Sequence, residues 1–159
     1  MRAHDRSGVA ERLVLVGRRR GPNPELDAAL AAPGARGRVE VVDGASDSEL
    51  DRLYRTATAL VHPSRYEGFG FTPLEAMARG CPVVASDIPA VREVSGDGAL
   101  LAPPGDETAW ADAITRVARD DALREELRAR GAATVGRYSW AESARGLCRV
   151  FAAAAAGPA

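Results

Sequence analysis

Two glutamates, Glu67 and Glu75, are the residues whose type and spacing best suit chemistry on a bound ligand. Seven residues separate them, and Gly68 and Gly70 lie in the interval. A carboxylate can accept hydrogen bonds from two neighbouring sugar hydroxyls, which few other side chains can do. Glycine has no Cβ, so the phosphates of a ligand can approach the backbone closely. We therefore expect a site here for an anionic group and a sugar.

The stretch lies at a predicted junction between a strand and a helix. An apolar run at 59–61 precedes it, and residues 74–79 predict a helix that Gly80 caps and Pro82 ends. Pro73 suits the first helical position. The first turn of a helix leaves N–H groups unpaired, and the helix dipole adds partial positive charge there. An anion is therefore favoured at this junction.

Each of these features has a plainer alternative. Thr72 and Glu75 have the spacing of a capping box, so Glu75 could serve only the start of the helix. Glu67 could be a solvated charge in a loop, and the glycines could serve a tight turn with Phe69 or Phe71 in the core. The stretch is not the dinucleotide-binding G-x-G-x-x-G fingerprint, because Pro73 stands where the third glycine belongs.

The stretch resembles the E-x(7)-E signature of retaining glycosyltransferases with the GT-B fold, particularly the large family four. The likeness extends from about Leu13 to Arg145, the C-terminal donor-binding half of that fold. Its segments occur in the family order: Pro63-Ser64, Glu67-Gly68-Phe69-Gly70, Pro73-Leu74-Glu75-Ala76-Met77-Ala78 and Gly80-Cys81-Pro82-Val83-Val84-Ala85.

The resemblance implies a role for each site residue. Glu67 would be catalytic, beside the reacting face of the sugar ring, and Glu75 would bind the ribose hydroxyls of the nucleotide. The base would lie near the loop after the second strand. The donor-binding residues implied are Gly68, Phe69, Gly70, Phe71, Thr72, Glu75, Val42 and Ser46.

Five short apolar runs alternate with helical patterns, which predicts an α/β fold with a doubly wound parallel sheet. The resemblance makes this the Rossmann-like half of a GT-B enzyme. We expect residues 1–10 to be a disordered or loosely packed lead-in, 11–155 the nucleotide-sugar-binding domain and 156–159 a frayed tail. In the last helix, an apolar face is expected to point inward. The inward residues of that helix are expected to be Ala144, Leu147, Cys148 and Phe151. The strands are expected at 13–16, 39–42, 59–61, 83–85 and 99–101.

The chain is shorter than the family pattern at its N-terminal end. The run at 13–17 matches the second strand of the family, and residues 1–10 contain no apolar β-branched run to supply the first. In the doubly wound order 3-2-1-4-5-6 the first strand is central. Without that strand, its two neighbours in the sheet must pair with each other or face each other with unpaired backbone groups, unless another chain supplies the strand. The basic phosphate-binding loop that follows the first strand in the family is also absent, as is the whole acceptor half.

Composition excludes several other classes of function. The net charge of −1 gives no electrostatic case for nucleic acid. Two histidines and two distant cysteines provide no zinc site, and reduced thiols favour a cytoplasmic location. No Asp-x-Asp occurs, in agreement with the metal-independent chemistry of GT-B enzymes. We expect no cofactor, with a GDP- or UDP-linked sugar as substrate.

Four further residues or runs have mainly structural interpretations. His62 is expected to pack at a strand end rather than act as a base. The arginines at 18–20 are expected to lie in a solvated loop and not to form a phosphate site. Glu93 is expected at a helix start, and Trp140 in the core or against the missing half.

The sequence therefore predicts the donor-binding part of a retaining hexosyltransferase that acts on a sugar, lipid or small-molecule acceptor. Without the missing N-terminal GT-B half or another chain, we expect it to be inactive or very weak. Two alternatives stay open: a non-catalytic nucleotide-binding module or inert fragment, and a GT-B-fold nucleotide-sugar epimerase.

Overall fold

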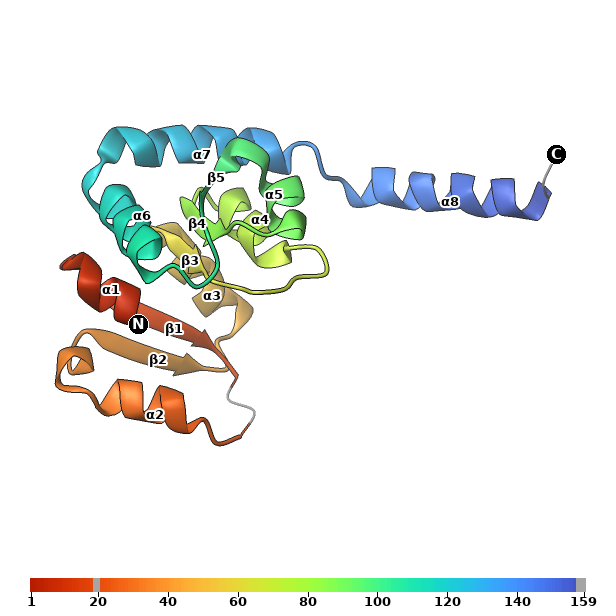
Figure 1. Ribbon diagram of the computed structural model, residues 1–159. Coiled ribbons are helices and arrows are strands. Elements are labelled where there is room, and N and C mark those ends of the chain that lie inside the picture. Colours follow the sequence, from red (N-terminus) through yellow and green to blue (C-terminus); the bar gives the residue numbers. More distant parts are fainter. Residues whose placement is uncertain (19–20, 157–159) are drawn as a thin grey trace.

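Short parallel strands form the centre of the fold in the computed structural model, which describes residues 1–18 and 21–156 (Figure 1). Each strand is a short run rich in apolar, often β-branched residues, which favour the pleated conformation. All five predicted strands are confirmed, each within one residue of its expected ends, and so is the α/β class. The strands are β1 (Leu13–Gly17), β2 (Val39–Asp43), β3 (Leu60–His62), β4 (Val83–Ser86) and β5 (Ala99–Ala102).

The strands form two sheets. β1 pairs in parallel with β2, while β3, β4 and β5 form a second parallel sheet in that order. In Figure 1 the two sheets lie one below the other, with β1 and β3 as the facing edges. Of the outcomes expected for a sheet without its central strand, the structure shows two strands that face each other unpaired.

Helices connect the strands and surround them. They are α1 (Arg2–Ser7), α2 (Pro24–Ala31), α3 (Asp47–Thr56), α4 (Phe71–Ala78), α5 (Pro89–Ser95), α6 (Glu107–Arg119), α7 (Asp121–Val135) and α8 (Trp140–Ala156), with short 3₁₀ turns η1 (Pro33–Ala35) and η2 (Gly96–Gly98).

Polar caps define several helix starts. The Ser-x-x-Glu spacing of Ser46 and Glu49 predicts a capping box, and the two residues form one at the start of α3. The Glu49 N–H donates to Ser46 Oγ at 3.3 Å, and the Ser46 N–H donates to Glu49 Oε2 at 2.8 Å. Asp106, a residue type that favours the N-cap position, accepts from the N–H groups of Thr108 and Ala109 at the start of α6. Such caps satisfy N–H groups that have no partner within the helix.

Two apolar clusters cover the two faces of the β3–β4–β5 sheet. Val83 and Ala85 of β4 belong to the cluster with α3, α4 and α5, while Val84 belongs to the cluster with α6 and α7. Alternate residues of a strand point to opposite faces, so β4 is covered on both sides. Its four residues are all buried. The candidate site therefore lies at the end of a sheet that is packed on both faces.

The expectation of a disordered or loosely packed lead-in at 1–10 is wrong. Residues 2–7 form α1, His4 is buried, and Ala3 packs on the cluster that contains Trp110 of α6. His4 Nε2 bonds to the Glu11 carbonyl at 2.8 Å, and Thr115 Oγ1 donates to the Ser7 carbonyl at 3.4 Å. The packing of Ala3 and these two hydrogen bonds hold the helix against the rest of the molecule, although its sequence is mostly polar.

Helix α7 continues beyond Gly131, although a glycine after the run that carries Leu123 and Leu127 predicts a helix end there. Gly131 is buried inside the helix, and a Cβ there would lie 3.0 Å from Met77 Cγ of α4. The glycine therefore serves close packing between two helices and does not end one.

The expected inward face of the last helix is also wrong. α8 extends away from the rest of the molecule (Figure 1), and Leu147 and Phe151 are 54% and 64% exposed. Trp140 is 81% exposed, so it is not a core residue. Ala144 and Cys148 are exposed as well. The helix is amphipathic, as its sequence pattern predicts, but no other described element covers its apolar face. The predicted tail at 156–159 lies outside the described residues except for Ala156, which ends α8.

Candidate functional site

The candidate site begins where β3 ends and α4 starts. Residues 63–70 form the connecting loop, and Gly70 is the N-cap of α4 with φ 109° and ψ 46°. A residue with a Cβ is strained in this conformation, so the backbone itself requires glycine here. Gly68 has an ordinary φ, and a Cβ there would meet no atom within 4 Å. The space beside Gly68 is therefore open.

The first turn of α4 has no side-chain cap. The helix begins at Phe71, so Pro73 is its third residue and not its first; proline is tolerated because N–H groups of the first turn have no partner within the helix. Phe71 is exposed and Thr72 is half-buried. The N–H groups of this turn and the positive end of the helix dipole therefore lie near the surface, at the carboxyl end of the parallel strands.

Glu67 is held by a histidine at the end of β3. His62 Nε2 and Glu67 Oε1 lie 2.9 Å apart, and the two side chains are 15% and 29% exposed. The contact joins the last residue of the strand to the loop that follows it. Ligands in open α/β folds bind at this end of the strands. His62 lies at the strand end as expected, but it also makes this polar contact, which the sequence analysis did not predict.

Glu75 does not cap α4. Gly70 is the N-cap, so Thr72 and Glu75 are the second and fifth helical residues and cannot form a capping box. Glu75 is exposed, and with Thr72 it lines an open groove that continues past His62 and Arg65. The structure therefore contradicts the capping alternative for Glu75 and places this residue at the edge of a groove.

Aromatic contacts fix the loop that carries these residues. The Phe69 ring lies 4.7 Å from that of Phe71 and meets Tyr138 edge-on at 5.8 Å, and Phe71 stacks on Trp140 at 6.1 Å. Tyr138 Oη donates to the Val94 carbonyl at 3.2 Å, which anchors the group to α5. Phe69 is half-buried and Phe71 is 53% exposed, so both anchor the loop at the surface and neither is in the core.

The two residues expected near the base, Val42 and Ser46, lie at the end of β2 and at the start of α3. Neither lines the groove that Thr72 and Glu75 share. The Ser46 hydroxyl donates to Glu49 Oε2 at 2.6 Å, and these hydrogen bonds hold the pKa of Glu49 below its ordinary value. The side chain of Ser46 is thus engaged in the helix cap, and its base contact stays a prediction.

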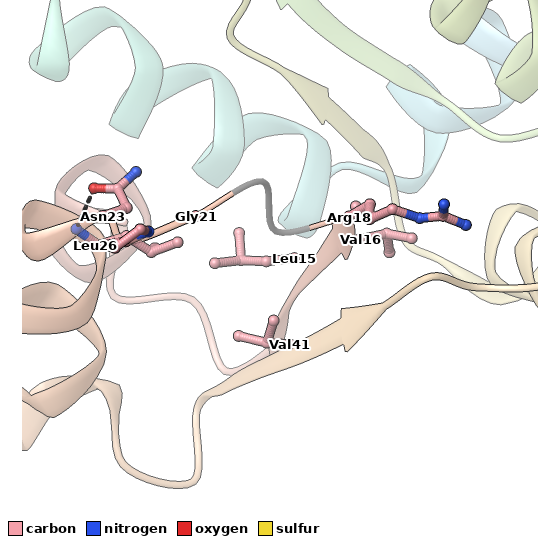
Figure 2. Close-up of a pocket in the computed structure, with 9 residues that line it drawn as sticks. Leu15, Val16, Arg18, Gly21, Asn23, Leu26 and Val41 are labelled. Carbon is pink, nitrogen blue, oxygen red and sulfur yellow. Dashed lines mark hydrogen bonds between the residues drawn. The ribbon is translucent and has the colours of Figure 1, made fainter.

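A second hollow of about 520 Å³ lies beside the carboxyl end of β1, between β2 and α2 (Figure 2). Leu15, Val41 and Leu26 make it largely apolar. Arg18 is at its rim, and Figure 2 shows its guanidinium pointing away from Leu15 and Val41. Of the three arginines at 18–20, only Arg18 is among the described residues, and it is exposed. Among the described residues that line the hollow, Arg18 is the one basic residue, and its guanidinium is directed away from the apolar lining.

A comparison with protein families decides the relationship of this chain. The family described as "Glycosyl transferases group 1" matches residues 2–120. The chain belongs to this family. Among curated relatives, the O-antigen chain mannosyltransferase B of Escherichia coli is 45% identical over 94 residues, which cover 59% of this chain and 25% of the relative. A D-inositol 3-phosphate glycosyltransferase of Nocardia farcinica is 35% identical over 153 residues, covering 92% of this chain and 34% of the relative.

Solved structures agree with this assignment. A sucrose-phosphate synthase from Thermosynechococcus elongatus has a TM-score of 0.84 at 26% identity, over 98% of this chain and 42% of that one. Anabaena HepE, solved in complex with UDP, has a TM-score of 0.83 at 22% identity, over 95% of this chain and 43% of that one. The chain thus shares the α/β fold of those two structures, and it spans about a quarter to a third of the length of the two curated relatives.

Two kinds of feature are missing from residues 1–18 and 21–156. They contain no group of three or more His, Cys, Asp or Glu residues placed to hold a metal ion. They also contain no helix that combines the length and the apolar character needed to cross a bilayer.

One polar contact that the sequence analysis missed connects α3 to α4 behind Glu75. Arg79 Nε donates to Asp51 Oδ1 at 2.9 Å, Arg79 Nη1 donates to the Glu75 carbonyl at 2.9 Å, and the guanidinium lies 5.5 Å from the Tyr54 ring centre. The Arg55 hydrogen bond, with Arg79 in addition, holds the pKa of Asp51 below its ordinary value. Asp51 and Arg79 are 28 residues apart in sequence, so no local pattern could have indicated the contact.

Proposed function

We propose that this chain is the donor-binding part of a retaining glycosyltransferase that takes a hexosyl group from a GDP- or UDP-sugar. The observation that carries the proposal is the arrangement at the β3–α4 junction. An uncapped helix start lies at the carboxyl end of the strands, with Glu67 before it and Glu75 after it. This is a suitable place for a diphosphate between two sugar rings, the hexose and the ribose.

In this proposal the N–H groups of Phe71 and Thr72 bind the diphosphate, while Gly68 leaves room for it to approach the loop. The Glu75 carboxylate accepts hydrogen bonds from the ribose hydroxyls along the groove. Val42 and Ser46 border the base from the β2–α3 loop through their backbone groups. Glu67, held by His62, accepts from hydroxyls of the hexose or of the acceptor.

The chemistry proposed at this site is a substitution at the anomeric carbon. The bond from that carbon to the diphosphate oxygen breaks, and a bond to the acceptor oxygen forms on the same face. The acceptor proton leaves to the departing phosphate or to solvent, and the nucleoside diphosphate carries away the bonding electron pair. The α4 start stabilises the negative charge that develops on the diphosphate, and such preorganised stabilisation is usually the largest catalytic contribution.

Transfer would require a partner that supplies the acceptor half. The chain spans about a quarter of the curated relatives such as the Escherichia coli mannosyltransferase. Closure of two halves normally excludes water from a site of this kind. We therefore propose that the acceptor is a sugar, lipid or small molecule held by the missing half, and that residues 1–159 alone transfer little or no sugar. Two unpaired cysteines, Cys81 and Cys148, support a reducing, cytoplasmic location.

A second candidate function is a nucleotide-binding module without catalysis. It is favoured by one specific observation, the break between β1 and β3, which leaves the site beside an open groove instead of a closed sheet. Such a module would bind a nucleotide but release no sugar from it, whatever partner is added.

Isothermal titration of the 159-residue chain with UDP, GDP, UDP-glucose and GDP-mannose tests the proposal. We expect binding of at least one pair, and we expect Glu75→Ala to weaken it at least tenfold through the lost ribose contacts. Glu126→Ala is the matched control, because Glu126 is an exposed helical glutamate that pairs with Arg130 on α7. It should bind as the unchanged chain does.

Each result has a defined meaning. No heat with any of the four ligands would reject the donor site. Equal loss of affinity in the two variants would show that the effect is one of charge or stability and not of the site. Binding that a complementary acceptor half never converts to free nucleoside diphosphate would favour the non-catalytic module.

A further inference from the structure

Glu75 and Arg79 have the spacing at which a glutamate and an arginine on one helix normally pair. Glu75 lies in α4, and Arg79 follows four residues later as the C-cap of that helix. With the glutamate on the N-terminal side, this is the favourable order for an ion pair. Yet the Glu75 carboxylate makes no hydrogen bond or ion pair within residues 1–18 and 21–156. Another group must therefore engage the guanidinium.

That group is the carboxylate of Asp51 on the neighbouring helix α3. Arg79 Nε donates to Asp51 Oδ1 at 2.9 Å. Arg79 Nη1 donates to the backbone carbonyl of Glu75 at 2.9 Å. The guanidinium also lies 5.5 Å from the centre of the Tyr54 ring, a favourable place for a cation. These three contacts hold the guanidinium between α3 and the backbone of α4, and the Glu75 carboxylate is left unpaired.

The Glu75 carboxylate lies within reach of the same guanidinium. The guanidinium already contacts the backbone of Glu75. Burial, and after it the charge of Glu75, raise the pKa of the Tyr54 hydroxyl, while the charge of Arg79 acts in the opposite direction. The two charges therefore act on one ring. A rotation of the Arg79 side chain away from Asp51 would direct its guanidinium to the Glu75 carboxylate.

The pair lies behind the groove of the candidate site and not in it. Glu75 and Tyr54 line that groove, whereas Asp51 and Arg79 do not. The side chains of Asp51 and Arg79 are 39% and 31% exposed, so water partly screens their charges. Apart from the long-range effect of these charges, the pair can act on a ligand in the groove only through Glu75.

We propose that Asp51 is a positioning residue for the candidate site: it holds the Arg79 guanidinium away from the Glu75 carboxylate and so keeps that carboxylate free to accept hydrogen bonds from a ligand. The effect on binding rests on the proposed function, because it requires a ligand with hydroxyls at Glu75. The arrangement of the side chains does not depend on a ligand. Without Asp51, the guanidinium pairs with Glu75 and competes with the ligand for its oxygens.

The direction of the effect separates this role from simple electrostatics. A nucleoside diphosphate is an anion, so the loss of the Asp51 charge would by itself tighten binding, and the loss of the Arg79 charge would weaken it. The positioning role predicts the opposite: weaker binding when Asp51 is removed, and recovery when Arg79 is removed as well. The double variant loses one negative and one positive group, so its net charge equals that of the unchanged chain.

NMR of the 159-residue chain tests the contact without a ligand. In the unchanged chain, the Arg79 Nε–H should show nuclear Overhauser contacts to the β-protons of Asp51. In Asp51→Ala it should show contacts to the γ-protons of Glu75 instead. Alanine favours a helix, so the variant should stay folded, and an amide spectrum unchanged outside α3 and α4 verifies this. An Arg79 side chain that turns to solvent in Asp51→Ala would overturn the inference.

Isothermal titration with UDP, GDP, UDP-glucose and GDP-mannose measures the effect on binding. Asp51→Ala should weaken the binding of each ligand that the unchanged chain binds by about two- to fivefold, because an exposed ion pair competes only weakly. Asp51→Ala with Arg79→Met should recover most of the lost affinity. Arg55→Ala is the matched control, since Arg55 Nε donates to the other oxygen of Asp51 at 2.7 Å and does not line the groove. It should bind as the unchanged chain does.

The binding results distinguish the positioning role from its alternatives. Equal or tighter binding by Asp51→Ala would overturn the role of Asp51. A double variant that binds as weakly as Asp51→Ala would also overturn it, because the pair would then serve only to fix α3 against α4. No binding of any of the four ligands to the unchanged chain would reject the proposed function instead. The NMR contact would then decide whether Asp51 holds Arg79 away from Glu75.

Discussion

At the scale of the residue, the contact between His62 and Glu67 shows how a loop acid can be fixed before any ligand arrives. A loop carboxylate normally samples several rotamers, and ordering it on binding costs free energy. Here a strand-end imidazole already holds one oxygen at 2.9 Å. The other oxygen is left to accept a hydroxyl. His62 is thus expected to act through Glu67 as a positioning residue.

His62→Ala should therefore weaken sugar recognition and leave nucleotide recognition intact. We expect the ratio of the Kd for UDP to that for UDP-glucose, or for GDP and GDP-mannose, to change three- to tenfold, about 0.7–1.4 kcal/mol. Isothermal titration of both ligands provides the ratio. His62→Gln, which keeps a donor near Glu67, should restore most of it; a ratio equal to that of the unchanged chain in His62→Ala would contradict the positioning role.

The buried thiol of Cys81 predicts how the free energy of unfolding depends on pH. Burial raises the pKa of its thiol to about 11, whereas Cys148 is exposed. Between pH 9 and 11 the unfolded chain loses this proton before the folded chain does, so the free energy of unfolding falls as pH rises. The stability advantage of the unchanged chain over Cys81→Ala should shrink by about 2 kcal/mol between pH 7.5 and 10.5 in urea unfolding. Cys148→Ala should show no such change.

At the scale of the element, much of the fold could be predicted because local signals agree with tertiary packing. Apolar runs of three to five residues gave all five strands, and Ser46 and Asp106 marked two helix starts. The failures occur where contacts far apart in sequence decide. Gly131 packs on Met77 instead of ending α7, and α1 is held by Thr115 across 108 residues.

The features of the candidate site also fall into those that local sequence predicts and those that depend on contacts far apart in sequence. The stretch from Glu67 to Glu75 was identifiable because its members are contiguous. The Asp51–Arg79 bridge and the packing of Tyr138 on Phe69 were not, because they depend on how α3 and α7 approach α4. The Thr72–Glu75 spacing of a capping box was the plainer alternative to a ligand contact, and the structure contradicts it because the N-cap is Gly70, two residues earlier.

Gly70 and Gly68 make a matched pair for testing the junction. Gly70→Ala should lower the free energy of unfolding by about 1–3 kcal/mol, because alanine is strained at φ 109°. Gly68→Ala should change it by less than about 0.5 kcal/mol, since its φ is ordinary and no atom lies within 4 Å of a built Cβ. Chemical denaturation measures both. If Gly68→Ala also weakens diphosphate binding without a change in stability, the glycine at 68 is needed for close approach of the ligand.

At the scale of the whole molecule, packing is concentrated around the β3–β4–β5 sheet. The most buried side chains, such as Val83, Val84 and Val91, belong to that sheet and the helices on it. The β1–β2 sheet has no fully buried residue in its strands, and α8 extends beyond both (Figure 1). Folding free energy should therefore come mainly from residues 60–135.

Removal of residues 140–159 tests this distribution. Every large side chain of α8 is exposed, and one ring stack, between Phe71 and Trp140, connects it to the site; such a stack contributes about 0.5–1.5 kcal/mol. We expect the thermal midpoint of the truncated chain to lie within about 6 °C of that of the full chain, at about 2–4 °C per kcal/mol for a chain of this size. Its helical circular dichroism should fall, because 17 helical residues are lost.

Leu127→Ala is the comparison variant for that truncation. Leu127 is 4% exposed on α7 within the cluster around Trp110, so truncating it should cost about 2–5 kcal/mol. One buried side chain is therefore expected to count for more than an entire terminal helix. A truncation as costly as Leu127→Ala would mean that α8 folds back onto the molecule in solution, and its apolar residues Leu147 and Phe151 would then be the first to examine for that contact.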